Sequence, residues 1–210
     1  MYRSVIFDLD GTLVDSSRGI IRATTEALET LGYPSMTSDE IRSLIGPPIG
    51  MAIVKSFGYD ESEIPRFNNV FRDLYKNKYL MEVEIYSGIT SLLECLKKKC
   101  FLSVATNKRC DYTRTMLDNL NISHYFDVIE GSDFDGKLSK KDLIERCISA
   151  SEVSRPEIVM VGDTENDAFA AEECGIDFIG VLYGMGFDRS EDVPYGTVAE
   201  STYALMDMLC

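Results

Sequence analysis

The chain has 210 residues, enough for one or two domains, and its 45% of hydrophobic residues suffices for a core. Its formal net charge of −14 argues against partners that require a positive face, so we expect neither nucleic acid nor an anionic membrane surface. The sequence contains no apolar run of about 18 residues and no basic, apolar leader, so we expect a cytoplasmic protein without a membrane span.

The cysteines form no CxxC pair, and most lie inside apolar helix or strand patterns. Without a secretion signal, this pattern is typical of reduced thiols. We therefore predict that all of them are free: Cys95, Cys100, Cys110, Cys147, Cys174 and Cys210. The single histidine, His124, cannot build a histidine-rich metal site, and we interpret it as a turn or packing residue.

The first predicted element is an apolar strand at residues 4–8, and a second aspartate, Asp10, follows closely. The next part of the chain, to residue 84, carries helical patterns such as "GIIRATTEALETLG". In "TSDEIRSLIG", Thr37 and Glu40 form a capping pattern that predicts the start of a helix. A helical stretch inserted between two strands is typical of a separate small domain, which we predict at residues 16–84.

From about residue 88 onward, short apolar strands alternate with helical patterns. The strands are predicted at residues 101–107, 127–131, 157–163 and 177–183. Strands that are apolar nearly throughout and are separated by helices indicate a parallel sheet covered on both faces. The sequence therefore predicts an α/β core domain at residues 1–15 and 85–210.

Polar residues follow several of the predicted strands. Because ligands of open parallel sheets bind beyond the carboxyl ends of the strands, we expect these residues to share one rim. They are Asp8, Asp10, Gly11 and Thr12, then Thr106, Asn107 and Lys108, and then Asp163 and Asp167. Each aspartate alone would more commonly be a helix cap or a turn residue. Together the carboxylates would repel each other, and Mg²⁺, which prefers oxygen ligands, is the natural counter-charge.

The motifs "DLDGT", "ATN", a following lysine and "VGDTEND", in this order, resemble the four-motif signature of the haloacid dehalogenase superfamily. The DxDGT form resembles its phosphatases, since the dehalogenases lack the second aspartate. The resemblance covers the whole chain. It implies a Rossmann-like core, a parallel sheet with helices on both faces, with an inserted all-helical cap domain in the position of residues 16–84.

The resemblance also implies roles for the rim residues. Asp8 would be the nucleophile that forms an aspartyl-phosphate, and Asp10 the general acid and then the general base. Mg²⁺ would be held by Asp8, Asp10 (through its main-chain carbonyl) and Asp163, with Asp167 either as a further ligand or as a support for the ligands. The phosphate-binding positions would be Gly11, Thr12, Thr106 and Asn107.

The catalytic lysine is the point at which this sequence departs from the commonest family pattern. Many relatives carry Lys-Pro-x-Pro, whereas this chain has "GKLSKKDLI". In that pattern, the distance from the lysine to the following Leu143 selects Lys137. Other relatives place the lysine three residues before an apolar pair, and Leu143–Ile144 then selects Lys140. We slightly favour Lys140 and retain both as candidates for neutralising the charge that develops on the phosphoryl group.

The predicted cap should select the substrate. "RSLIGPPIGMAIVKSF" resembles the corresponding stretch of phosphoglycolate phosphatase-like members and of relatives labelled 5′-nucleotidases. Arg42 and Lys55 are candidate substrate contacts, although a charged residue in such a position is more often a plain surface charge. Lys108, on the predicted rim of the core, is the stronger candidate.

These observations predict a Mg²⁺-dependent phosphatase that hydrolyses a small, phosphoglycolate-like phosphomonoester. The alternatives are a 5′-nucleotidase or pyrophosphatase of the same family, and a sugar phosphomutase, which would release little phosphate. A receiver domain phosphorylated on aspartate is disfavoured by the Asp8–Asp10 pair and the inserted helices. We expect a small phosphorylated metabolite as the partner, and a monomer or a homodimer.

Overall fold

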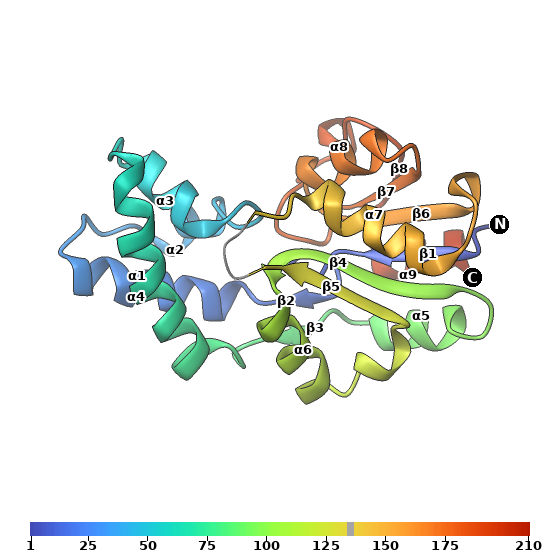
Figure 1. The fold of residues 1–210 in the computed structure, drawn as a ribbon, viewed down its shortest axis with the longest axis horizontal. Coiled ribbons are helices and arrows are strands. Elements are labelled where there is room, and N and C mark those ends of the chain that lie inside the picture. The colour runs from blue at the N-terminus through green and yellow to red at the C-terminus, as the bar shows by residue number, and fades with distance from the viewer. Residues whose placement is uncertain (134–136) are drawn as a thin grey trace. The chain divides into compact units, whose positions relative to one another are not determined.

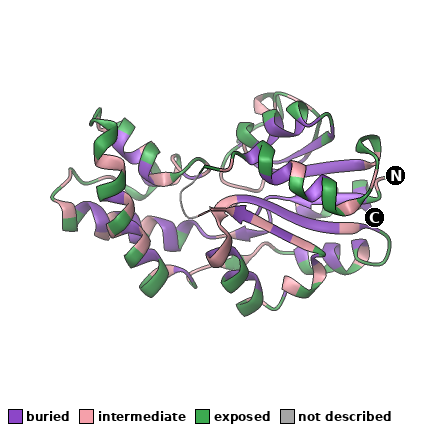
Figure 2. Ribbon diagram, viewed as in Figure 1, coloured by how far each residue is buried: buried purple, intermediate pink, exposed green. Residues whose placement is uncertain are grey.

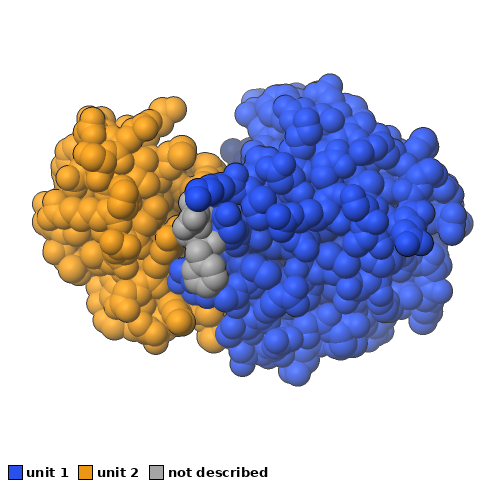
Figure 3. Space-filling view, viewed as in Figure 1, with its two compact units in different colours: residues 1–15, 85–210 blue, residues 16–84 orange. Residues whose placement is uncertain are grey.

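The structure is a computed structural model, and it describes residues 1–133 and 137–210. The chain divides into two compact units. Unit 1 comprises Met1–Asp15 and Ile85–Cys210, and unit 2 comprises Ser16–Glu84 (Figure 3). None of the helices within the described ranges is both long and apolar enough to cross a membrane.

Unit 1 is built on a sheet that has six strands in the described part of the chain, in the order β5-β4-β1-β6-β7-β8 (Figure 1). All neighbouring strands in this sheet are parallel. The strands are β1 (Ser4–Phe7), β4 (Phe101–Arg109), β5 (Val128–Ser132), β6 (Ile158–Gly162), β7 (Asp177–Val181) and β8 (Thr197–Ala199). The predicted α/β class is confirmed, and β8 is an additional edge strand whose three residues are too few for a recognisable apolar pattern.

Helices cover both faces of this sheet (Figure 1). On one face, Ile6 and Met160 share an apolar cluster with α7 (Lys140–Ser151) and α8 (Glu165–Glu173). Alternate strand residues point to the opposite face, where Phe7 packs edge-to-face on Phe126 at 6.5 Å between ring centroids. The helices α5 (Ile89–Leu96) and α6 (Cys110–Asn119) lie on that side in Figure 1. The central strands β1 and β6 are accordingly buried along their whole length, whereas the edge strands β5 and β8 are buried only in part (Figure 2).

The remaining elements of unit 1 are short. Strand β2 (Val14–Asp15) pairs with β3 (Glu84–Ile85) where the chain passes between the two units. Three 3-10 turns lie at Ser123–Tyr125, Arg155–Glu157 and Ser190–Asp192, and α9 (Thr202–Leu209) ends the chain.

Unit 2 consists of helices α1 (Ser17–Leu31), α2 (Ser38–Arg42), α3 (Ile49–Ser56) and α4 (Ile64–Leu74), with a 3-10 turn at Glu61–Glu63 and a π-helical turn at Tyr75–Tyr79. Helix α2 starts with the predicted capping box: the Glu40 amide donates to Thr37 Oγ1 at 3.2 Å, and the Thr37 amide donates to Glu40 Oε2 at 2.7 Å. Helix α4 and the π-helical turn that follows it carry a stack of aromatic rings, Phe67 on Phe71 on Tyr75. These contacts give the unit an apolar interior of its own.

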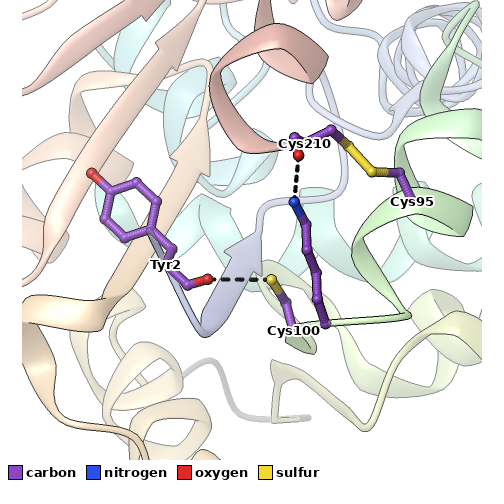
Figure 4. Close-up of a disulfide and its surroundings, with 5 residues drawn as sticks. Tyr2, Cys95, Cys100 and Cys210 are labelled. Atoms are coloured by element: carbon purple, nitrogen blue, oxygen red, sulfur yellow. Dashed lines mark hydrogen bonds between the residues drawn. A yellow bond between two sulfur atoms is a disulfide. The ribbon is translucent and has the colours of Figure 1, made fainter.

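The structure corrects the expectation that all cysteines are free thiols. A disulfide joins Cys95 of α5 to Cys210, beyond α9, with 6.3 Å between their Cα atoms (Figure 4). Beside it, Lys99 Nζ donates to the Cys210 carbonyl at 2.6 Å, and Cys100 Sγ donates to the Tyr2 carbonyl at 3.4 Å (Figure 4). The free thiols are Cys100, Cys110, Cys147 and Cys174. Two cysteines separated by 115 residues give no local spacing signal, which is why the pair could not be predicted.

Candidate active site

The acidic residues come together because parallel strands end at the same edge of the sheet. Phe7 of β1 is in register with Val161 of β6, and the Asp8 amide donates to the Val161 carbonyl at 2.9 Å. Asp8 therefore directly follows β1, and Asp163 directly follows β6. Asp167 lies in the first turn of α8, where it forms a capping box with Thr164. One ligand oxygen from each of the three aspartates lies within 4.8 Å of the others.

Lys140 is the cation at the centre of this cluster. Its Nζ lies 2.6 Å from Asp8 Oδ1 and 2.7 Å from Asp167 Oδ1. The lysine is the first residue of α7, following the N-cap residue Ser139. A positive charge at a helix N-terminus opposes the helix dipole. Lys140 is also buried, so without partners its charge would be costly to withdraw from water. The carboxylates of Asp8 and Asp167 offset both the unfavourable helix dipole and this burial.

Burial and mutual repulsion alter the proton affinities of the cluster. Burial raises the pKa of Asp8 to about 6, against the lowering effect of Lys140. Burial and the neighbouring carboxylates of Asp167 and Asp8 also raise the pKa of Asp163 well above its ordinary value. Burial lowers the pKa of Lys140, but Asp167 and Asp8 outweigh this and raise it. The lysine is therefore held as a cation, whereas burial and neighbouring carboxylates disfavour the ionised forms of Asp8 and Asp163.

This donor set fits a hard divalent cation. The cluster offers buried carboxylate oxygens from three aspartates, which are the ligands that Mg²⁺ prefers. Asp167 already accepts hydrogen bonds at both oxygens, from Lys140 at Oδ1 and from Thr164 at Oδ2. Asp8 Oδ1 accepts from Lys140, so one ammonium group is shared between the carboxylates of Asp8 and Asp167.

The second aspartate of the first motif has a different partner. Lys108 Nζ donates to both oxygens of Asp10, at 2.9 and 2.8 Å. Strand β4 extends to Arg109, beyond the predicted end at Asn107, and its pairing with β5 is irregular between Thr106 and Arg109. Such an irregularity redirects side chains at a strand end. Lys108 was predicted as a substrate contact. In the structure it forms a nearly buried ion pair with Asp10, the predicted general acid and base.

The predicted phosphate-binding positions surround these aspartates. Gly11 has φ of +85°, and a Cβ there would lie 2.0 Å from Asp163 Oδ2. This residue is therefore required both for its backbone conformation and for the close approach of Asp163. Thr12 Oγ1 lies 3.4 Å from Asp163 Oδ1, and the buried Thr106 Oγ1 accepts a hydrogen bond from the Lys108 amide at 3.2 Å. Asn107 is half-buried in the irregular part of β4.

The structure distinguishes the two candidate lysines by position. Lys140 lies in the cluster, whereas Lys137 is exposed and its amide donates to Asp133 Oδ1 at 2.8 Å. Arg42, the predicted substrate contact in unit 2, donates from Nη1 to Ser17 Oγ at 3.0 Å within that unit. A role for Arg42 in substrate binding therefore stays a prediction.

The segment after β7 also contacts the site, and the sequence did not predict it. The amides of Met185 and Gly186 donate to Asp163 Oδ2 at 2.8 and 3.1 Å. The Tyr183 hydroxyl donates to the Thr12 carbonyl at 3.0 Å. Backbone amides have no residue signature, so only the glycines of "YGMG", at the carboxyl end of a strand, could have pointed to this segment.

Comparison with known proteins agrees with this geometry. Residues 5–181 match the family described as haloacid dehalogenase-like hydrolase, and the chain belongs to this family. It is 33% identical over 193 residues to a 5′-nucleotidase of Pseudomonas aeruginosa, covering 91% of this chain and 86% of that protein. It is 28% identical over 218 residues to a phosphoglycolate phosphatase of Vibrio parahaemolyticus, covering 98% and 95%.

A solved structure of the same fold extends the comparison to three dimensions. The crystal structure of a predicted phosphatase from Clostridium acetobutylicum has a TM-score of 0.92 at 30% identity, covering 99% of this chain and 98% of that one. The resemblance that the motifs indicated is therefore confirmed, and the protein is a hydrolase of the haloacid dehalogenase-like family.

Proposed function

We propose that the protein is a Mg²⁺-dependent phosphatase that hydrolyses a small phosphomonoester through an aspartyl-phosphate on Asp8. The observation that carries this proposal is the buried cluster in which Lys140 contacts Asp8 and Asp167 while Asp163 lies beside them. Asp8 and Asp163 would hold Mg²⁺, together with the Asp10 main-chain carbonyl, and Asp167 would hold Lys140 in place. When bound, the ion would neutralise charge on the phosphoryl oxygens and on the carboxylates.

The residues of the chain divide the reaction into two displacements. In the first, an Asp8 oxygen forms a bond to phosphorus, the bond from phosphorus to the leaving oxygen breaks, and Asp10 donates a proton to that oxygen. In the second, Asp10 accepts a proton from water, whose oxygen attacks phosphorus and releases Asp8 and phosphate. Lys140 and the Thr106 hydroxyl would stabilise the charge on the phosphoryl oxygens during both steps.

We propose phosphoglycolate or a related small anion as the substrate. The similarity to a phosphoglycolate phosphatase supports this choice, and the similarity to a 5′-nucleotidase supports a nucleoside monophosphate as the second candidate. Residues 16–84 would act as the cap that selects the substrate, with Arg42 as a candidate contact. A cytoplasmic location and a monomeric or homodimeric state stay predictions from the sequence.

Substitution of the nucleophile tests the mechanism. Asp8→Asn should reduce phosphate release by at least about 10³-fold, because an amide cannot attack phosphorus, and should abolish acid-stable labelling of the protein by ³²P-phosphomonoester. Asp207→Asn, a change at an exposed position of α9, is the matched control and should behave as wild type. Substantial turnover by Asp8→Asn would remove Asp8 from the role of nucleophile.

Two further measurements address the metal and the substrate. Phosphate release should stop in EDTA and recover with excess Mg²⁺, and an unchanged rate in EDTA would overturn the metal-dependent mechanism. Phosphoglycolate, nucleoside monophosphates, pyrophosphate and sugar phosphates should then be compared at equal concentration. Isomerisation of a sugar phosphate with little phosphate release would identify a phosphomutase instead.

A further inference from the structure

A short segment after β7 encloses the aspartate that follows β6. We call residues 183–187 the strap. Three of its backbone amides donate to Asp163: those of Met185 and Gly186 to Oδ2, at 2.8 and 3.1 Å, and that of Phe187 to the main-chain carbonyl, at 2.9 Å. The strap therefore holds both the side chain and the backbone of a single residue.

The glycines of the strap are needed because the backbones approach so closely. A Cβ on Gly184 would lie 2.4 Å from the Gly11 carbonyl oxygen and 2.5 Å from Asp163 Cβ. A Cβ on Gly186 would lie 2.2 Å from the Asp163 carbonyl oxygen. Neither glycine has a positive φ, so the constraint is the space that a side chain would fill and not the backbone conformation.

Both ends of the strap are anchored in unit 1. The Tyr183 hydroxyl donates to the Thr12 carbonyl, and its ring packs edge-to-face on Tyr86 at 5.1 Å between centroids. At the other end, the buried Phe187 packs on Phe178 of β7 at 6.4 Å. Because the strap is already ordered at both ends, it can hold the Asp163 carboxylate in one orientation without a further loss of its own conformational entropy.

The two oxygens of Asp163 have unequal surroundings. Oδ2 receives the two strap amides and is covered by the backbone of Gly11 and Gly184, where an added Cβ would lie 2.0 and 2.7 Å away. In the part of the chain that the structure describes, Oδ1 receives no backbone amide: its hydrogen bond is the long one of 3.4 Å from the Thr12 hydroxyl, and an added Cβ on Gly11 would lie 2.7 Å from it. We propose that the strap is a positioning element of the metal site, which occupies Oδ2 so that Oδ1 is presented to the cation. This inference rests on the proposed Mg²⁺-dependent phosphatase.

The test measures Mg²⁺ binding directly, by titration calorimetry of the substrate-free protein. Gly186→Ala and Gly184→Ala should weaken Mg²⁺ binding by at least about 10-fold, the usual effect of disturbing groups that orient a ligand. At saturating Mg²⁺ the KM for substrate should change less than about 2-fold, because the strap acts through Asp163 and not on the substrate. The control is Gly50→Ala in α3 of unit 2, where the added Cβ would lie 2.0 Å from Asn68 Oδ1 and would crowd no strap residue.

A milder variant covers the case in which the alanine variants do not fold. Tyr183→Phe removes only the hydrogen bond to the Thr12 carbonyl and should weaken Mg²⁺ binding by about 2- to 5-fold. Wild-type Mg²⁺ affinity in Tyr183→Phe and in the folded variants of Gly184 and Gly186, or an equal loss in Gly50→Ala, would overturn the role of the strap. If the wild-type protein binds no Mg²⁺ at all, the proposed function fails, and this inference fails with it.

Discussion

The two units hold their charged residues in different ways. At the rim of the sheet in unit 1, the side chains of Lys140 and Lys108 are only 3% and 6% exposed, and each contacts aspartate oxygens at 2.6–2.9 Å. In unit 2, the ion pair of Arg66 with Glu63 has side chains that are 57% and 35% exposed. Charges withdrawn from water must be balanced by neighbouring charges, whereas exposed charges are balanced by solvent. Only the first arrangement prepares a site for chemistry on an anion.

The largest effect should come from removing the central cation of unit 1. Lys140→Met keeps the length of the side chain but leaves Asp8 and Asp167 without their shared partner. We expect a loss of about 3–5 kcal/mol in the free energy of unfolding, the usual result of breaking a buried ion pair, measured by urea denaturation in EDTA. Phosphatase activity should fall by at least about 10²-fold.

Lys137→Met is the control for this substitution, because Lys137 is exposed and lies three positions away along the chain. It should leave the urea midpoint and kcat nearly unchanged. The opposite pattern, in which Lys137→Met is inactive and Lys140→Met is active, would show that the catalytic lysine had been assigned to the wrong residue.

The next effect is a pH dependence that is specific to the metal-free protein. The pKa of Asp8 is raised from 3.8 to about 6 in the folded state, so the folded protein binds more protons than the unfolded chain between these values. Its contribution to stability is therefore fully present below pH 3.8 and is lost as the pH rises through about 6. The raised pKa of Asp163 acts in the same direction.

Urea denaturation in EDTA at several pH values between 4 and 7 measures this loss. The free energy of unfolding of the wild-type protein should fall by up to a few kcal/mol over this interval, and that of Asp8→Asn should fall less. Saturating Mg²⁺ should reduce the fall, because a bound cation favours the ionised carboxylates. A pH profile that is identical in the wild type and Asp8→Asn would exclude Asp8 as its source.

The sequence predicts best those features that depend on position along strands. The apolar strands predicted the parallel sheet, and the shared rim of parallel strands brought Asp8 and Asp163 together as expected. The choice between Lys137 and Lys140 remained open because it depends on where one helix begins. Ser139 and Asp142 form the capping box that starts α7 at Lys140. That pattern was present in "SKKD" and predicts the helix start at Lys140, while the catalytic role of this lysine stays a prediction.

Other features of unit 1 left no signal in the sequence. The strap acts through backbone amides that any residue can supply, and its glycines are distinctive only once Asp163 is placed against them. Similarly, the pair of Lys108 with Asp10 joins residues that are 98 positions apart, and it depends on the irregular pairing at the end of β4. Contacts between distant parts of the chain are fixed by packing, which local patterns do not record.

The smallest effect is expected in unit 2 and sharpens the comparison. Arg66→Ala removes the pair with Glu63 and a ring contact with Tyr33 at 5.9 Å. Because water and salt already screen both charges, the thermal unfolding midpoint should shift by at most about 2 °C, and the shift should shrink further in 0.5 M NaCl. If Arg66→Ala destabilised the fold as much as Lys140→Met, the exposure of an ion pair would not determine how much it contributes to stability. A small, salt-sensitive shift, beside a large effect of Lys140→Met, would show that burial decides which charges in this chain matter.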